Sequence, residues 1–231
     1  MTPRATARAL GAGVLVLAAW LVSAAPVAAH ERQALPAPGF EPPAPGTYTL
    51  QRIMAAPDGD VVGLDGRPQR LAAYTHERIT LLGFIYTTCV DPDGCPRAYR
   101  VFEAVHEAVA AAPALRERVR LVTLSFDPAR DTPSAMQRYA GSRARPGAVP
   151  WLFLTTRSAR ELMPLLDGFG QDIRYTTNRS GGAPRRELSH VLKVFLIDRA
   201  GFVREIYSSE FLYPRTVLND IETLVLEDRA R

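Results

Sequence analysis

The two cysteines of this 231-residue chain, Cys89 and Cys95, are the residues with the greatest capacity for chemistry. A cysteine thiolate attacks disulfides and binds soft metal ions, whereas the protonated thiol does neither well. Five residues separate the two cysteines, and the Asp-Pro-Asp-Gly sequence at 91–94 is typical of a turn. The loop can therefore fold back and bring the sulfurs together, where they could form a disulfide, exchange disulfides or hold one metal ion.

His190 is the candidate third ligand for such an ion. Thiolates select Cu(I) among the metals that an exported protein meets, with Cu(II) as the alternative oxidation state. Two sulfurs leave the coordination shell of copper incomplete, and a neutral imidazole nitrogen can add to it. His190 stands directly before the apolar segment 191–197. The alternative interpretation is a histidine that enters a strand or makes a buried hydrogen bond.

The cysteines lie between a segment with the pattern of a strand and one with the pattern of a helix. Residues 79–86 are a continuous apolar run, typical of a strand buried on both faces. Pro96 suits the first turn of a helix. The apolar residues after it recur at helical spacing: Val101, Val105, Ala108, Val109 and Ala112. The pair is therefore expected between a central strand and a helix N-terminus, where the helix field favours thiolate.

The alternation of strands and helices continues to the C-terminus. We expect the following elements: strands over 119–126 and 151–154, helices over 132–140 and 159–169, a hairpin of 191–197 and 202–207, and a last helix over 214–226. This order predicts an α/β fold, a thioredoxin-like three-layer sandwich with a central mixed sheet. The turn-rich segment 48–71 is expected to add short strands as an N-terminal extension, and 176–186 to be a mobile loop leading into His190.

The first 46 residues have the composition of an export signal and a tether. Residues 1–29 combine basic residues, a 14-residue apolar run and a small-residue end at Ala29, as in a secretory signal peptide. The apolar run is shorter than the roughly 20 residues that span a bilayer, so we expect cleavage, with an uncleaved membrane anchor as the alternative. We expect a Pro/Ala-rich tether over 30–46 and one domain over 47–231. The mature chain would be periplasmic and close to the membrane, without a transmembrane helix.

The net charge bears on nucleic-acid binding, and the expected export bears on the state of the two cysteines. The formal net charge is +4, and the basic residues are scattered, which argues against nucleic acid as a partner. Outside the cytosol an isolated cysteine pair is usually a disulfide, either structural or exchanging.

Four blocks, in order along the chain, resemble the Sco/SenC family of copper-binding, thioredoxin-fold proteins that help assemble the CuA centre of cytochrome c oxidase. The blocks are Phe84-Ile85-Tyr86-Thr87-Thr88-Cys89 with Cys95-Pro96, Phe126-Asp127-Pro128-Ala129-Arg130-Asp131-Thr132-Pro133, Trp151-Leu152-Phe153-Leu154-Thr155, and His190 with Leu196-Ile197-Asp198 and Gly201. The resemblance covers residues 47–228. The family pattern has three residues between its cysteines, whereas this chain has five.

The resemblance implies an exported copper metallochaperone. Cys89, Cys95 and His190 would bind copper and deliver it to a cuproprotein such as a cytochrome c oxidase subunit. The alternative is a thiol-disulfide oxidoreductase, in which the two cysteines are a redox pair that keeps acceptor cysteines reduced without metal. A third interpretation is a binding module stapled by a structural disulfide. Asp131 or Thr132 is expected to cap the following helix, with Arg130 paired locally.

Overall fold

Strand β4 (Ile79–Ile85) is the centre of the fold because all seven of its residues are buried. Successive side chains of a strand point to opposite faces of its sheet. Accordingly, Leu81 belongs to the hydrophobic cluster on one face of the sheet, and Leu82 and Phe84 belong to the cluster on the other. The continuous apolar run is therefore the doubly covered strand that the sequence predicts.

The computed structural model describes residues 35, 37–178 and 185–230, which belong to one unit, Ala34–Arg231. The segment 1–29, expected to be a signal peptide, lies outside these residues. Within the described ranges, no helix combines the length and the hydrophobicity that a membrane crossing requires.

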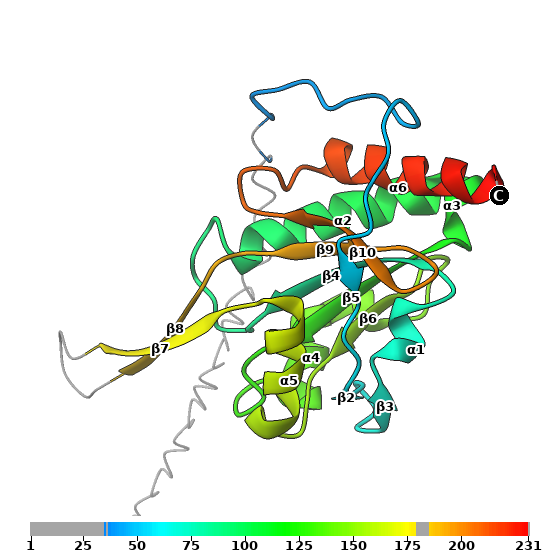
Figure 1. The fold of residues 1–231 in the computed structure, drawn as a ribbon. Helices are drawn as coiled ribbons and strands as arrows, with labels where there is room; N and C mark the ends of the chain where they lie inside the picture. The colour runs from blue at the N-terminus through cyan, green and yellow to red at the C-terminus, as the bar shows by residue number, and fades with distance from the viewer. Residues whose placement is uncertain (1–34, 36, 179–184, 231) are drawn as a thin grey trace, which may run out of the picture. The chain divides into compact units, whose positions relative to one another are not determined.

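Among the described residues, six strands form a mixed central sheet (Figure 1). In spatial order they are β1 (Met54–Ala55), β10 (Phe202–Tyr207), β9 (Val194–Ile197), β4, β5 (Val119–Ser125) and β6 (Trp151–Leu154). Strands β4, β5 and β6 are parallel, whereas the β4–β9, β9–β10 and β10–β1 pairs are antiparallel. Parallel neighbours require crossover connections, which α2 (Cys95–Ala111) and α4 (Pro133–Ala140) supply. The segments that follow β4 and β5 therefore leave the same edge of the sheet.

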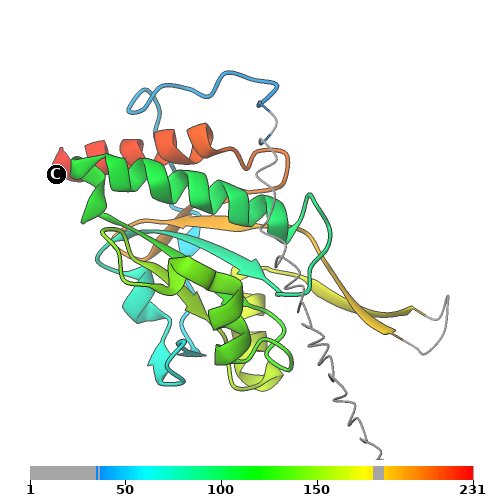
Figure 2. The same ribbon diagram turned by 180° about the vertical axis from the view of Figure 1, so that it is seen from behind.

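Helices cover both faces of this sheet and give it three layers. Helices α2 and α6 (Pro214–Arg229) pack with Leu81 on one face, and α5 (Ala159–Phe169) packs with Phe84 on the other. Figure 2 shows α2 and α6 side by side, and the two helices are in contact. Three short helices complete the set among the described residues: α1 (Ala72–Thr75), α3 (Pro113–Arg116) and the 3₁₀ helix η1 (Gly141–Ala144). The predicted thioredoxin-like three-layer sandwich is confirmed.

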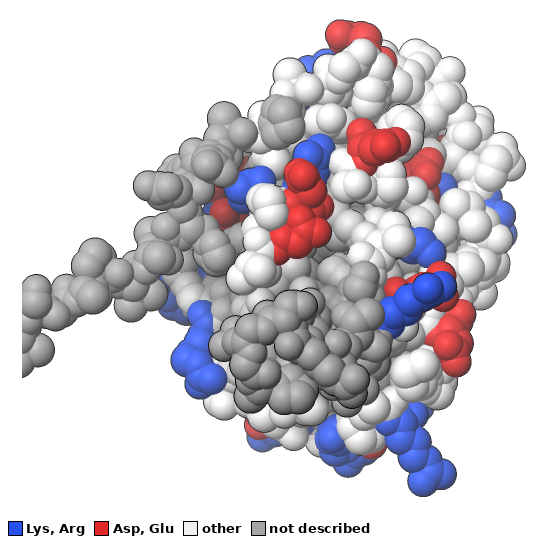
Figure 3. All heavy atoms as spheres, turned by 90° about the vertical axis from the view of Figure 1, so that its left-hand side faces the viewer, with Lys and Arg blue, Asp and Glu red and all other residues white. Residues whose placement is uncertain are grey.

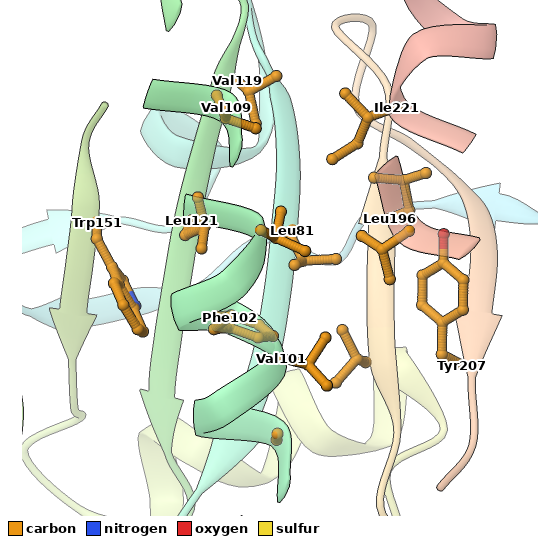
Figure 4. Close-up of a cluster of buried hydrophobic side chains, with 14 of the residues drawn as sticks. Leu81, Val101, Phe102, Val109, Val119, Leu121, Trp151, Leu196, Tyr207 and Ile221 are labelled. Atoms are coloured by element: carbon orange, nitrogen blue, oxygen red, sulfur yellow. The ribbon is translucent and has the colours of Figure 1, made fainter. Parts of the chain in front are cut away.

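Helix α2 lies close to β4 because Gly83 has no side chain. A Cβ atom at this position would lie 3.0 Å from Cζ of Phe102, closer than ordinary packing allows. Figure 4 shows Phe102 in the same cluster as Leu81 and Leu121. This contact sets the distance between the helix and the sheet, and thereby the position of Cys95, the first residue of α2.

Residues before β4 extend the fold on its N-terminal side. Strand β1 is added at the edge of the central sheet, and β2 (Asp60–Val62) pairs with β3 (Pro68–Arg70) in a separate two-stranded sheet. These short strands confirm the expected N-terminal extension.

Part of the segment expected to be a poorly packed tether, 30–46, is packed against α6. The side-chain amide of Asn219 donates a 2.8 Å hydrogen bond to the carbonyl of Pro43. The backbone N–H of Gly46 donates a 3.0 Å bond to Oγ1 of Thr223. The described residues of this segment, 35 and 37–46, form no helix or strand, yet they contact α6.

A hairpin occupies much of the segment for which the sequence predicts a mobile loop. Strands β7 (Ile173–Asn178) and β8 (Arg185–His190) pair antiparallel, with Ile173 opposite His190. The prediction of a loop over 176–186 is therefore wrong at both ends of that range, and 179–184 lie outside the described residues. The sheet strand β9 begins only at Val194, so His190 ends the hairpin instead of directly preceding that strand.

Candidate functional site

The segment between β4 and α2 folds back on itself and brings the two cysteines together. Its turn is closed by a 3.0 Å hydrogen bond from the Gly94 N–H to the Asp91 carbonyl and a 3.1 Å bond from the Asp93 N–H to Oδ1 of Asp91. The Cys95 thiol donates a hydrogen bond to the Cys89 sulfur. The turn-forming sequence thus produces the return that the spacing predicts, with two free thiols in contact.

The two cysteines differ in exposure, and the loop between them faces solvent. Cys95 is 1% exposed, whereas Cys89 is half-buried and Val90 beside it is 90% exposed. Asp91 and Asp93 are exposed as well. On the face of the described residues shown in Figure 3, acidic and basic side chains are interspersed among uncharged ones. A partner can therefore reach Cys89 first, through an exposed loop.

The surroundings of the two cysteines lower the pKa of Cys89 and raise the pKa of Cys95. The hydrogen bond from the Cys95 thiol lowers the pKa of Cys89 to about 6 against the opposing effect of burial. The backbone N–H groups of Cys95 and Asp91 and the hydroxyl of Tyr86 lower it further. The pKa of Cys95 is raised by its hydrogen bond to Cys89, by burial and by the charge on Cys89. At neutral pH the site therefore holds one thiolate, Cys89, which accepts a hydrogen bond from the protonated thiol of Cys95.

This division predicts the pH dependence of alkylation in the reduced, copper-free protein. A lowered thiol pKa means that thiolate dominates above that pKa, so the iodoacetamide reaction of Cys89 should have its midpoint at about pH 6. Cys95→Ala removes the S–H donor and should move the midpoint up toward the ordinary cysteine value of about 8.5. Mass spectrometry of the labelled chain measures both. A wild-type midpoint as high as that of Cys95→Ala would contradict the assigned hydrogen bond.

His190 and Cys89 contact the same aromatic residue, Tyr86. The ring of His190 contacts Phe126 at a centroid distance of 4.6 Å and Tyr86 at 5.8 Å, both edge to face. Tyr86 in turn donates its hydroxyl hydrogen to the Cys89 sulfur. The hairpin β7–β8 therefore brings the late histidine of the chain to the residue that contacts Cys89. Sequence reasoning assigned no role to Tyr86, although it stands three residues before Cys89.

The imidazole of His190 is in the form that binds metal. Burial lowers its pKa, against the charge of Asp91, which raises it, so the neutral ring is favoured at pH 7. Its Nε2 is buried and has no hydrogen-bond partner among the described residues. An unpaired buried nitrogen costs free energy that a ligand bond can recover.

The arrangement is not a complete metal site. Across the described part of the chain, no three His, Cys, Asp or Glu side chains are close enough together to hold one ion. The structure brings Cys89 and Cys95 together and places His190 one aromatic residue away. The donor types, two thiols and a neutral imidazole, nevertheless suit copper. A shared ion would require His190 and the cysteine loop to approach each other.

The block 126–133 borders the same edge of the sheet. As predicted, Arg130 pairs locally, with a 3.1 Å contact to the carboxylate of Asp127. Thr132 caps α4, its Oγ1 accepting a 3.3 Å bond from the Ala135 N–H. Asp131, the other residue expected as a cap, turns instead toward the cysteine segment. The sequence carries no local signal for this choice, because its partner is Thr87.

The sequence and the fold were compared with those of known proteins. The sequence profile of the SCO1/SenC family matches residues 69–226. The chain belongs to the SCO1/SenC family. The matched range includes Cys89, Cys95 and His190 and contains all four blocks that resemble the family. A comparison with curated proteins finds no match.

Solved structures of Sco proteins share the fold of this SCO1/SenC chain. The apo Sco1 protein of Thermus thermophilus is 26% identical with a TM-score of 0.61, over 78% of this chain and 95% of that one. The copper-bound ScoI of Arabidopsis thaliana is 17% identical with a TM-score of 0.61, over 75% and 99%. BsSco, a member of the Sco family of cytochrome c oxidase assembly proteins in which a disulfide switch has been identified, is 20% identical with a TM-score of 0.55, over 75% and 94%.

Proposed function

We propose that this SCO1/SenC protein is a copper metallochaperone that binds one copper ion with Cys89, Cys95 and His190. One observation carries the proposal. Cys89, which contacts Cys95, and the half-buried His190 both contact Tyr86, and the buried Nε2 of His190 has no hydrogen-bond partner among the described residues. Copper-bound structures of Sco proteins from other organisms support the choice of metal.

The proposed cycle uses the properties of the individual ligands. Cys89 is a thiolate at neutral pH and would bind the ion first, after which Cys95 would lose its proton and add a second sulfur. His190 would complete the shell, and Cu(I) is the favoured oxidation state because two of the three ligands are soft. The ion would then pass by ligand exchange to a cuproprotein such as a cytochrome c oxidase subunit. Oxidation of the pair to a disulfide would remove both thiolates and block binding.

We place this activity in the periplasm. The support is the signal-like sequence of residues 1–29 and the isolated cysteine pair, which is typical of proteins in an oxidising compartment outside the cytosol. Sequencing the N-terminus of the protein isolated from a periplasmic fraction tests both points, because a chain that begins at His30 requires export and cleavage.

Copper titration of the reduced chain tests the function directly. With a coloured Cu(I) chelator as competitor, the protein should remove one equivalent of copper from the chelator. A chain that removes none at any chelator concentration is not a copper chaperone.

His190→Ala should weaken copper binding by more than the roughly 10- to 100-fold that mutations next to metal ligands cause, because a ligand itself is lost. His76→Ala is the matched control, since His76 is exposed and bonded to the carbonyl of Ala72. The chelator competition measures both variants. Equal affinities of the His190 and His76 variants would remove His190 from the ligand set.

A thiol-disulfide oxidoreductase is the second candidate function. It is favoured by the half-buried Cys89 thiolate next to a buried, protonated Cys95, an arrangement that suits an attacking and a resolving thiol. The two functions differ in their use of His190. If exchange is the function, His190→Ala should leave the rate of reduction of a disulfide-containing acceptor nearly unchanged, and the wild type should bind no copper.

A further inference from the structure

Asp131 is a buried carboxylate whose contacts go beyond the local needs of its own loop. It is 1% exposed and forms no ion pair with any described residue. Burying a carboxylate away from water is costly unless hydrogen bonds replace its hydration. The groups that supply those bonds therefore indicate what the residue holds in place.

Three hydrogen bonds reach this carboxylate, and two of them come from one residue, Thr87. The Thr87 N–H donates to Oδ2 at 3.1 Å, and its hydroxyl donates to Oδ1 at 2.5 Å. The hydroxyl of Ser125, the last residue of β5, donates to Oδ2 at 2.6 Å. Asp131 thus connects the end of β5 to a residue 44 positions earlier in the chain.

Thr87 lies inside the turn that carries Cys89 out of the sheet. Strand β4 ends at Ile85, and the Cys89 N–H donates a 3.1 Å hydrogen bond to the Tyr86 carbonyl. A bond to the backbone of Thr87 and another to its side chain fix both the position and the orientation of this turn. Cys89 follows only two residues later, so its sulfur moves with the turn.

We propose that Asp131 is the positioning residue for Cys89: by holding Thr87 through two hydrogen bonds, it places the Cys89 sulfur against that of Cys95. This inference deepens the proposed function, because it concerns the same two sulfurs. It requires no copper, so it survives if copper binding fails.

The positioning has a measurable consequence for oxidation of the pair. With glutathione disulfide as oxidant, the Cys89 thiolate and the Cys95 thiol give up two electrons and one proton and form one S–S bond. Glutathione disulfide takes up the two electrons, that proton and one more from water, and becomes two glutathione thiols. The equilibrium constant depends on how often the two sulfurs meet, that is, on their effective concentration. A loosened turn lowers this concentration and favours the dithiol.

The test is the redox equilibrium of the full, copper-free chain in glutathione buffers. Thr87→Val keeps the shape of the side chain but removes the hydroxyl donor. It should lower the equilibrium constant for disulfide formation about tenfold, which raises the reduction potential by about 30 mV. Thr87→Ser restores the donor and should stay within about twofold of the wild type. Asp131→Asn, which loses one acceptor oxygen, should shift the constant in the same direction as Thr87→Val.

Thr132→Val is the control for a merely structural effect. It removes the cap of α4 in the neighbouring loop without touching Thr87, so it should lower the unfolding free energy and leave the redox equilibrium unchanged. If Thr87→Val and Asp131→Asn lose stability yet keep the wild-type equilibrium constant, Asp131 only supports the fold and the proposal is overturned. Should one of the two variants not fold, the other decides the outcome by the same criterion.

Discussion

Replacing either cysteine with serine is expected to abolish stoichiometric copper binding. A serine hydroxyl is a hard, neutral ligand at pH 7, whereas Cu(I) favours thiolate. Cys89→Ser removes the thiolate of the pair, and Cys95→Ser removes the sulfur that hydrogen-bonds to it. Each variant should bind copper more than about 100-fold more weakly than the wild type. This exceeds the loss that mutations of residues next to metal ligands cause.

The measurement is the chelator competition with both single variants and the double variant. Circular dichroism is the control for folding, because Cys95 is 1% exposed and its replacement changes a packed position. His190→Ala gives an intermediate reference, since it leaves both sulfurs in place. If the double variant still takes up one copper per chain, the metal binds elsewhere and Cys89 and Cys95 are not its ligands.

Loss of Arg204 is expected to produce the largest change in stability. Its side chain is 5% exposed and pairs with Asp198 at 3.0 Å and with Glu227 at 2.8 Å. Its Nε also donates to the carbonyl of Leu50 at 3.1 Å. Arg204→Met keeps much of the packing but leaves a buried carboxylate without its cation. Removing one partner of a buried pair costs about 3–5 kcal/mol.

Urea denaturation of the wild type and Arg204→Met measures this loss as a difference in unfolding free energy. Arg70→Met is the matched control, because Arg70 also pairs with two carboxylates, Asp58 and Asp60, but its side chain is 56% exposed. Solvent screens exposed pairs, so this variant should remain close to the wild type. Equal losses in the two variants would show that burial does not set the contribution of the Arg204 pairs.

Most of the central fold follows from apolar patterning. The predicted helix over 159–169 and the predicted strand over 202–207 agree with α5 and β10 residue for residue, and β4 and β5 end one residue earlier than predicted. These elements have a buried face or are buried throughout, so apolar residues recur in their sequences at the spacing of a helix or a strand. The hairpin β7–β8 was missed because its polar sequence has no apolar period. Its strands pair with each other outside the central sheet.

In the candidate site, too, the local contacts could be predicted from the sequence and the long-range contacts could not. The contact between Cys89 and Cys95 could be predicted, because only a short turn-forming loop separates them and the turn residues act locally. Three relations could not be predicted from local sequence: Tyr86 between Cys89 and His190, the packing of His190 on Phe126, and the bonds of Asp131 to Thr87. Each brings together residues that lie far apart in the sequence.

The amino-acid sequence alone dictates the order of the elements, the burial of β4 and the closeness of the two sulfurs, since these depend on hydrophobicity and short-range chain geometry. Packing of the strands decides which distant side chains meet at the carboxyl edge of the sheet. Hydrogen bonds require donor and acceptor atoms to lie within a few tenths of an ångström of a set distance, and ring contacts require centroids about 4.5–7 Å apart. Neither residue type nor spacing encodes such a distance between segments that lie 44 to 104 residues apart.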